Sequence, residues 1–247
     1  MKLKLYFALP FILQATIWRI LMRPFFYLFF GLKVRGLENL QGLPKGVIFA
    51  PNHSSELDSV LLPLALPLWS RFSPMFYIVR EPKFYTDPVF KWRRHFYDLL
   101  PFRSLGAHPI VSGVRDYAVS LATHVSILKD GGSVCIFPEG SFTKDGSIGK
   151  AHGGVSYLCH SSQSYVVPVH IEGTFKVSVL NTLIRRSRVT VTFLAPIPHT
   201  AMSPAPTLDE FVSFAENVLD SVRSARIAGL THAPKSRVVQ PTVHSKI

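Results

Sequence analysis

Residues 46–58 read GVIFAPNHSSELD, an apolar segment followed directly by a polar one. Residues 46–50 are apolar and end at Pro51, which is typical of a buried β-strand. The polar residues 52–58 follow at once, and the apolar residues 59–69 after them predict a helix. A buried strand, a polar loop and a helix form the repeating unit of α/β proteins, in which sites lie at the carboxyl ends of the strands.

The same alternation continues on both sides of this unit. Further strands are predicted at 75–79, 133–137, 165–171 and 188–194, with a short strand and turn at 33–40. Helical spacing of apolar residues predicts helices at 85–99, 114–129 and 208–226. The sequence therefore predicts an α/β fold with a mixed, largely parallel sheet flanked by helices. Pro168 favours an edge position or a bulge for its strand.

The N-terminus is the most apolar part of the chain. Residues 5–18 form an uncharged run, and a second apolar run ends before Lys33. Neither run reaches the roughly 20 residues that a membrane-spanning helix needs. We therefore expect two short helices, broken near Arg23 and Pro24, that form an interfacial or re-entrant membrane anchor over residues 1–33. A signal peptide and a single tilted transmembrane helix are the alternatives.

The rest of the chain then divides into two parts. Residues 34–226 are expected to form the main domain, because the alternating apolar pattern fills this range. Residues 227–247 lack any apolar periodicity and are expected to form a flexible tail.

The chain is both apolar and basic. Lys+Arg number 27 and Asp+Glu 15, which gives a net charge of +12, yet only 17% of the residues are charged. Apolar surface enters the acyl region of a bilayer while Lys and Arg face anionic head groups, so this composition favours a membrane surface. The low charged fraction argues against a disordered chain. The positive charge forms no single stripe and no nucleic-acid motif is visible, so nucleic acid is not an expected partner.

Cys135 and Cys159 lack the spacing of a disulfide framework or of a zinc site. We expect both to be small core residues, and we expect no metal ion. Unpaired cysteines are compatible with a reducing compartment.

His53 and Asp58 are the residues to which catalytic chemistry can be assigned most directly. A carboxylate that accepts a hydrogen bond from one imidazole nitrogen leaves the other nitrogen free to take a proton from a hydroxyl. Their spacing corresponds to about 140° around an ideal helix, so the two would not share a face within one. We therefore expect His53 at the junction of loop and helix, with Asp58 in the first turn and Asn52 or Ser54 as the helix cap. The alternative is that His53 is an ordinary loop residue and Asp58 a surface residue.

A second polar segment, FPEGS at 137–141, follows the strand predicted at 133–137. A turn of Glu139, Gly140 and Ser141 can present a carboxylate and backbone N–H groups to a polyol or a phosphate. No G-x-S-x-G pattern occurs in the chain, so a serine-hydrolase mechanism is not indicated. The basic residues that could bind a phosphate are Arg103, Arg115, Lys144 and Lys150.

The order of these segments carries a family resemblance. NHSSELD at 52–58, a basic segment at 103–115, FPEGS at 137–141 and VPV at 167–169 resemble the motifs of the glycerolipid acyltransferases of the lysophosphatidic acid acyltransferase type. The resemblance covers about residues 34–195, and the apolar N-terminus resembles the two-helix membrane anchor of bacterial members.

The resemblance implies a membrane-associated enzyme that moves a fatty acyl group from acyl-CoA or acyl carrier protein to the free hydroxyl of a lysophospholipid. The foremost acceptor would be 1-acyl-glycerol-3-phosphate, which gives phosphatidic acid. His53 would be the base and Asp58 its partner, with no cofactor beyond the thioester co-substrate, at the cytoplasmic face of a membrane. The substrate-binding residues that it implies are Asn52, Arg115, Glu139, Gly140, Ser141, Lys150 and Pro168.

Two departures from the family pattern concern phosphate binding. The arginine of the basic motif falls where this chain has Val111, Ser112 and Gly113, so Arg115 is a candidate and Arg103 its rival. Many members also carry an arginine where this chain has Phe142. The alternatives are therefore the same chemistry on a zwitterionic or amino-lipid acceptor, or a non-catalytic protein that binds membranes or lipids.

Overall fold

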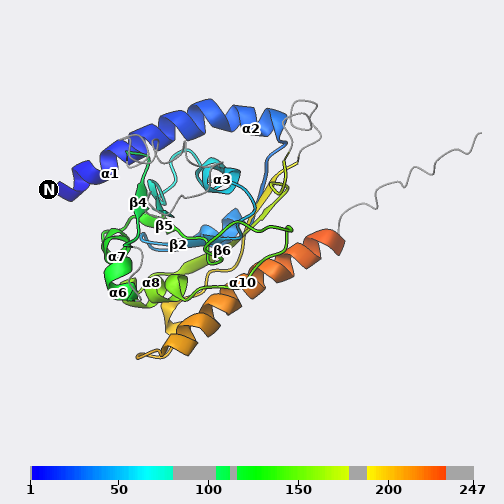
Figure 1. Ribbon diagram of the computed structural model, residues 1–247. Coiled ribbons are helices and arrows are strands. Elements are labelled where there is room, and N and C mark those ends of the chain that lie inside the picture. Colours follow the sequence, from blue (N-terminus) through cyan, green and yellow to red (C-terminus); the bar gives the residue numbers. More distant parts are fainter. Residues whose placement is uncertain (1, 80–103, 112–115, 178–187, 232–247) are drawn as a thin grey trace, which may run out of the picture.

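The computed structural model describes residues 2–79, 104–111, 116–177 and 188–231 (Figure 1). The helix expected at 85–99 lies outside these ranges, as do Arg103 and Arg115. The described residues form a seven-stranded sheet with the order β1-β7-β6-β2-β5-β3-β4. Its strands are β1 (Lys33–Arg35), β2 (Ile48–Pro51), β3 (Met75–Val79), β4 (Ala107–Pro109), β5 (Ser133–Cys135), β6 (Val166–Glu172) and β7 (Thr190–Phe193).

The predicted mixed, largely parallel sheet is confirmed. β2 pairs in parallel with β5 and β6, and β3 with β4 and β5, whereas β7 runs antiparallel to β6. The short strand β4 is an addition to the predicted set. Since β2 and β5 are parallel neighbours, the polar segments that follow them leave the sheet at the same end. The topology thus brings residues 52–58 and 137–141 together.

Helices cover both faces of the sheet (Figure 1). On one face lie α3 (Leu57–Ala65) and the N-terminal helix; on the other lie α7 (Ala122–Lys129), α8 (Gly154–Ser162) and α10 (Leu208–Thr231). The residues of β2 alternate between two hydrophobic clusters: Phe49 belongs to the first, and Ile48 and Ala50 to the second. Burial on both faces explains why this strand reads as an unbroken apolar run.

The structure corrects several predicted helix boundaries. α3 ends at Ala65, because Leu66 directly precedes Pro67 and has the extended conformation that a following proline favours. The helix expected at 114–129 is divided at Leu121 into α6 (Tyr117–Ser120) and α7. α8 was not predicted, although Val155, Leu158 and Cys159 show helical spacing. α10 continues to Thr231, beyond the helix end expected at 226, and the rest of the expected tail lies outside the described residues. Short 3₁₀ helices complete the described elements: η2 (Leu37–Leu40) and η5 (His199–Ala201).

The prediction of an edge strand or bulge at Pro168 is also wrong. β6 lies inside the sheet, with Pro168 opposite Ala50 of β2. The N–H of Leu194 donates to the carbonyl oxygen of Pro168 at 2.9 Å. In a strand the N–H and C=O of one residue point to the same side, so the missing donor of Pro168 faces the position just beyond the end of β7. Pro168 therefore lies where the hydrogen-bond ladder between β6 and β7 ends, and the sheet accommodates it there.

The N-terminal helix runs without the expected break. α1 (Lys2–Leu13), the π-helical η1 (Gln14–Met22) and α2 (Arg23–Phe29) follow one another directly, and both junction residues, Leu13 and Arg23, have helical dihedral angles. Pro24 falls in the first turn of α2, the position where a missing N–H is best tolerated. The two expected helices are therefore one rod (Figure 1).

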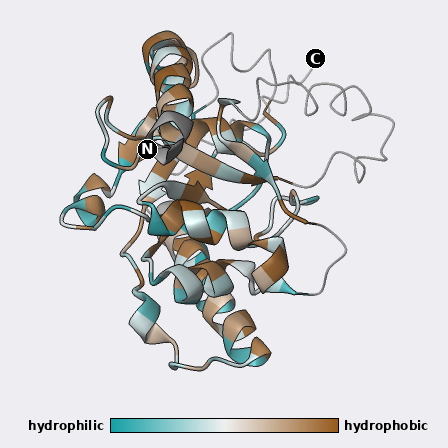
Figure 2. Cartoon of the chain, turned by 90° about the vertical axis from the view of Figure 1, so that its left-hand side faces the viewer, coloured by the Kyte–Doolittle hydropathy of each residue, from teal (hydrophilic) through white to brown (hydrophobic). Residues whose placement is uncertain are grey.

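This rod exposes several large apolar side chains and buries two polar ones, besides the apolar residues such as Phe26 that it packs into the core. It is largely apolar in colour in Figure 2. Gln14 and Arg19 are nevertheless buried against the domain, where their side chains donate to backbone carbonyl groups. The large apolar residues exposed on the rod are Leu9, Ile12, Ile20, Leu21, Phe25, Tyr27 and Leu28. Among the helices of the described residues, none combines the length and the apolar character that crossing a membrane requires.

Candidate active site

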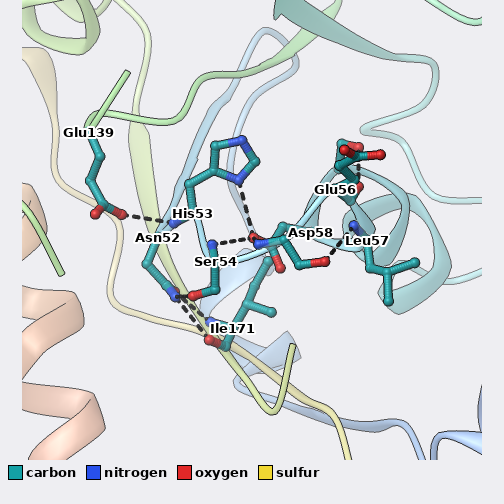
Figure 3. A network of polar contacts seen from close by, with 10 residues as sticks. Asn52, His53, Ser54, Glu56, Leu57, Asp58, Glu139 and Ile171 are labelled. Carbon is teal, nitrogen blue, oxygen red and sulfur yellow. Dashed lines mark hydrogen bonds and ion pairs between the residues drawn. The ribbon is translucent and has the colours of Figure 1, made fainter. Parts of the chain in front are cut away.

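His53 and Asp58 meet at the carboxyl end of β2 (Figure 3). Nδ1 of His53 lies 3.1 Å from Oδ2 of Asp58. Asp58 is in the first turn of α3, and His53 is in the loop before it. This is the arrangement that the sequence predicts for the pair. The His53 side chain is 13% exposed and that of Asp58 is fully buried, so the imidazole alone reaches solvent.

The carboxylate of Asp58 also shapes the loop that holds His53. Its Oδ2 accepts hydrogen bonds from the backbone N–H groups of Ser54 at 2.6 Å and Ser55 at 2.7 Å (Figure 3). The predicted cap by Asn52 or Ser54 is therefore wrong, because Asp58 binds the free N–H groups before the helix from within its first turn. A carboxylate can only accept, so Nδ1 of His53 carries the proton and Nε2 has the free lone pair.

Asn52 fastens this loop to the neighbouring strand. Its Nδ2 donates to the carbonyl oxygen of Ile171 at 2.9 Å, and its Oδ1 accepts from the N–H of Ile171 at 2.8 Å. The side chain is 4% exposed. These bonds show Asn52 joining β2 to β6; its expected contact with substrate stays a prediction.

Glu139 joins the two polar segments. Its Oε1 accepts from the N–H of His53 at 2.8 Å, and its Oε2 accepts from the N–H of Gly149 at 2.7 Å. The residue is buried, so both bonds are sheltered from water. The carboxylate thus fixes the backbone of His53 from the side opposite Asp58 (Figure 3).

A protein-family model described as Acyltransferase matches residues 31–172, more than half of the chain, and its range includes His53, Asp58 and Glu139. The chain belongs to this acyltransferase family. It is 27% identical over 151 residues to chloroplastic 1-acyl-sn-glycerol-3-phosphate acyltransferases of Arabidopsis thaliana and Brassica napus. The match covers 61% of this chain but only 38% and 40% of those proteins, so the chain spans about two fifths of their length.

A solved structure supports the fold. The crystal structure of the 1-acyl-sn-glycerophosphate acyltransferase PlsC from Thermotoga maritima superposes with a TM-score of 0.57 and 21% identity. The superposition covers 87% of this chain and 78% of that one. The chain therefore shares that fold.

The other predicted substrate-binding residues lie in the loop after β5 and in β6, except Arg115. Gly140 and Ser141 follow Glu139 directly, and Gly140 has a φ of +67° that favours glycine. Lys150 is exposed and follows Gly149, the partner of Glu139. Pro168 is buried in β6 beneath the site. Arg115 lies outside the described residues.

Sequence reasoning missed the aromatic rings around His53. Phe137 stacks on the imidazole with ring centroids 3.6 Å apart, and Phe142 lies over it at 4.1 Å. Phe137 belongs to the F-P-E-G motif, but nothing in the sequence indicates where its ring points.

Sequence reasoning also missed a pocket behind the loop. It has a volume of about 140 Å³, and Asn52, Ser54, His170, Glu172 and Arg226 are among its lining residues. Burial lowers the pKa of His170, and Glu172 and Arg226 line the same pocket. Arg226 is far along the chain from the motifs, in α10, which is why spacing could not reveal it.

The two cysteines are core residues, as predicted. Cys135 and Cys159 are both free and buried. Burial, and after it the nearby Asp58 carboxylate, raises the pKa of the Cys135 thiol well above its usual range. Burial raises the pKa of Cys159 to about 12. Within the described ranges, no three His, Cys, Asp or Glu side chains gather as metal ligands would.

Proposed function

We propose that the protein transfers a fatty acyl group from a thioester to the free hydroxyl of 1-acyl-glycerol-3-phosphate, which yields phosphatidic acid. The observation that carries this proposal is the imidazole of His53, held by Asp58 at the end of β2 in a chain of the acyltransferase family. The two plant relatives, which are 1-acyl-sn-glycerol-3-phosphate acyltransferases, support the choice of acceptor. The donor, acyl-CoA or acyl carrier protein, is part of the proposal.

The proposed reaction needs only one proton carrier. Nε2 of His53 takes the proton of the acceptor hydroxyl while that oxygen bonds to the carbonyl carbon of the thioester. The C–S bond of the resulting tetrahedral species then breaks, and the thiolate leaves with the proton from the imidazolium. The products are an ester and a free thiol. Asp58 stays ionised throughout, since its part is to orient the ring and stabilise its positive charge.

The charged end of the acceptor would lie over the loop that follows Glu139. Lys150 is exposed beside Gly149, and Gly140 and Ser141 start the same loop next to His53. We therefore keep Lys150, Ser141 and the backbone of Gly140 as proposed contacts of the head group. Arg115 remains a candidate from the sequence alone.

We also propose that the protein works on the cytoplasmic face of a membrane, with the outward face of its N-terminal rod in one leaflet. The support is the burial pattern, because Gln14 and Arg19 point inward while Ile20, Leu21 and Leu28 are more than half exposed. Such an apolar face with basic residues near it fits an interfacial helix on anionic lipids.

An acyl-transfer assay on vesicles tests the proposed function. The full chain is offered lysophosphatidic acid, lysophosphatidylcholine, lysophosphatidylethanolamine and a lyso-aminolipid, each with acyl-CoA and with acyl carrier protein. Lysophosphatidic acid is expected to be acylated fastest. A clear preference for a zwitterionic or amino-lipid acceptor would contradict the choice of acceptor. Vesicle binding without turnover of any pair would show a non-catalytic lipid-binding protein instead.

A further inference from the structure

The imidazole of His53 is enclosed by two phenylalanine rings. On one face the ring of Phe137 is nearly parallel, with an interplanar angle of 14° and a centroid distance of 3.6 Å. On the other, Phe142 is tilted by 40° at 4.1 Å. Phe137 packs against the hydrophobic cluster beneath the sheet, whereas Phe142 is 39% exposed. The inner wall is thus part of the core, and the outer wall is part of a surface loop.

The backbone that carries Phe142 is tied to His53 itself. The N–H of Thr143 donates to the carbonyl oxygen of His53 at 2.9 Å. Glu139, three residues before Phe142, accepts from the N–H of His53. Phe142 is therefore held on both sides of its position by the backbone of the residue that its ring covers.

The rest of this loop is held by hydrogen bonds within the loop and by hydrogen bonds from α10. Oδ1 of Asp145 accepts from Thr143 Oγ1, Ser147 N and Ser147 Oγ. From α10, the guanidinium of Arg226 donates to the carbonyl oxygen of Gly146 at 2.7 Å, and that of Arg223 to Gly149. Such a network orders an exposed loop well enough to hold a ring in a fixed place.

An imidazole needs this support because a single bond to Asp58 does not fix its plane. Rotation about the Cβ–Cγ bond would take Nδ1 away from the carboxylate and Nε2 away from the acceptor. Rings stacked on both faces oppose that rotation, and their faces also attract the imidazolium that forms during proton transfer.

We propose that Phe142 is a positioning residue: together with Phe137 it clamps His53 so that Nδ1 stays on Asp58 and Nε2 points to the acceptor hydroxyl. The clamp rests on the proposed function for its catalytic consequence, but the geometry it requires can be measured without activity. Phe142 acts through His53 and not through the substrate.

The variant Phe142→Leu tests the clamp, because leucine fills similar space without an aromatic face. We expect kcat to fall about tenfold while KM for donor and acceptor changes less than about twofold, since orientation and not binding is lost. Phe142→Tyr keeps the aromatic face and is expected to restore kcat. Phe175→Leu is the matched control: its ring lies against Gly146 of the same braced loop, and we expect wild-type kcat from it.

A second readout does not depend on catalysis. Diethyl pyrocarbonate modifies neutral imidazole nitrogens, and the rate at His53 can be followed by peptide mass spectrometry with His160 of α8 as internal reference. Phe142→Leu is expected to raise the His53 rate several-fold relative to His160, and Phe142→Tyr to return it.

Three results would overturn the clamp: an unchanged kcat with an unchanged His53 rate in Phe142→Leu, a raised KM at wild-type kcat, or an equal loss of kcat in Phe175→Leu. A wild-type protein without acyl transfer would contradict the proposed function instead. In that case the modification rates alone decide whether the clamp exists.

Discussion

The loop around His53 and the N-terminal rod use buried polar side chains in the same way but present opposite surfaces. In the loop, Asn52, Asp58 and Glu139 are buried and bind backbone groups, which leaves one imidazole edge exposed. In the rod, Gln14 and Arg19 are buried and bind backbone carbonyls, which leaves an apolar face exposed. In both regions the inward polar groups position the element, and the outward groups carry the proposed function: proton transfer in one, lipid contact in the other.

In the rod, burying a polar side chain can cost free energy, as Arg19 shows. Burial lowers the pKa of the Arg19 guanidinium, and among the described residues its Nε and Nη2 have no hydrogen-bond partner. Gln14 is better served, since it exchanges hydrogen bonds with both the N–H and the C=O of Met75. The comparison therefore predicts that Gln14 stabilises the docked rod more than Arg19 does.

The largest effect is expected from Asp58→Asn. The amide oxygen would take the place of Oδ2, because the N–H groups of Ser54 and Ser55 donate to that position as well as His53. The neutral side chain would then no longer stabilise the imidazolium that forms during proton transfer, and we expect kcat to fall about a hundredfold or more. Asp209→Asn, at an exposed carboxylate in the first turn of α10, is the control and should retain wild-type kcat. Wild-type turnover in a folded Asp58→Asn protein would contradict the role of Asp58 in proton transfer by His53.

His124 is buried but, unlike His53, it is not paired with a carboxylate of the described residues. Burial, and then the neighbouring His108, lowers the pKa of His124 to about 4. The unfolded chain takes up this proton near pH 6.5 and the folded chain only near pH 4, so the unfolded state binds more protons in between. The free energy of unfolding should therefore fall by ~3 kcal/mol as the pH drops through this window.

The variant His124→Leu removes that contribution. Urea denaturation at pH 7, 5.5 and 4.5 should give a flatter pH dependence for the variant than for the wild type. Equal slopes would show that His124 keeps an ordinary pKa in the folded protein.

The next effect concerns the docking of the rod. Gln14→Leu removes two donated bonds and one accepted bond, and leaves Met75 backbone groups buried without partners. We expect a loss of ~2–3 kcal/mol in the free energy of unfolding, measured by urea denaturation. Thr16→Ala, an exposed position on the same rod, should change it by less than ~0.5 kcal/mol. An equal loss of unfolding free energy in both variants would mean that the hydrogen bonds of Gln14 do not stabilise the docked rod.

Ile20→Ser and Leu21→Ser are expected to have the smallest effect on stability but a clear effect on binding to membranes. Both side chains are about three-fifths exposed, so stability should hardly change. Each substitution should weaken binding to vesicles with anionic lipids about tenfold, because apolar surface leaves the acyl region. Leu208→Ser removes an equally exposed leucine on α10, across the sheet, and should bind like wild type. Unchanged binding in the rod variants would place the lipid contact elsewhere.

Local patterns predicted the strand, the loop and the place of His53 and Asp58, because all of these depend on residues close together in the chain. The partners that fix the loop could not be predicted in the same way. Ile171 lies 119 residues from Asn52, and Glu139 lies 86 residues from His53. Such pairs depend on strand order, which one sequence does not reveal. The expected break at Pro24 failed for a different reason, since a π-helical segment before it leaves the proline at a tolerated position.

In the proposed reaction, Nε2 of His53 takes the acceptor proton. To test this, wild type and His53→Ala are compared in acyl transfer to lysophosphatidic acid on the same vesicles, with thermal unfolding and vesicle binding measured in parallel. We expect product formation by His53→Ala to fall to background while folding and vesicle binding match wild type. Substantial product from the folded, membrane-bound variant would contradict this role of His53.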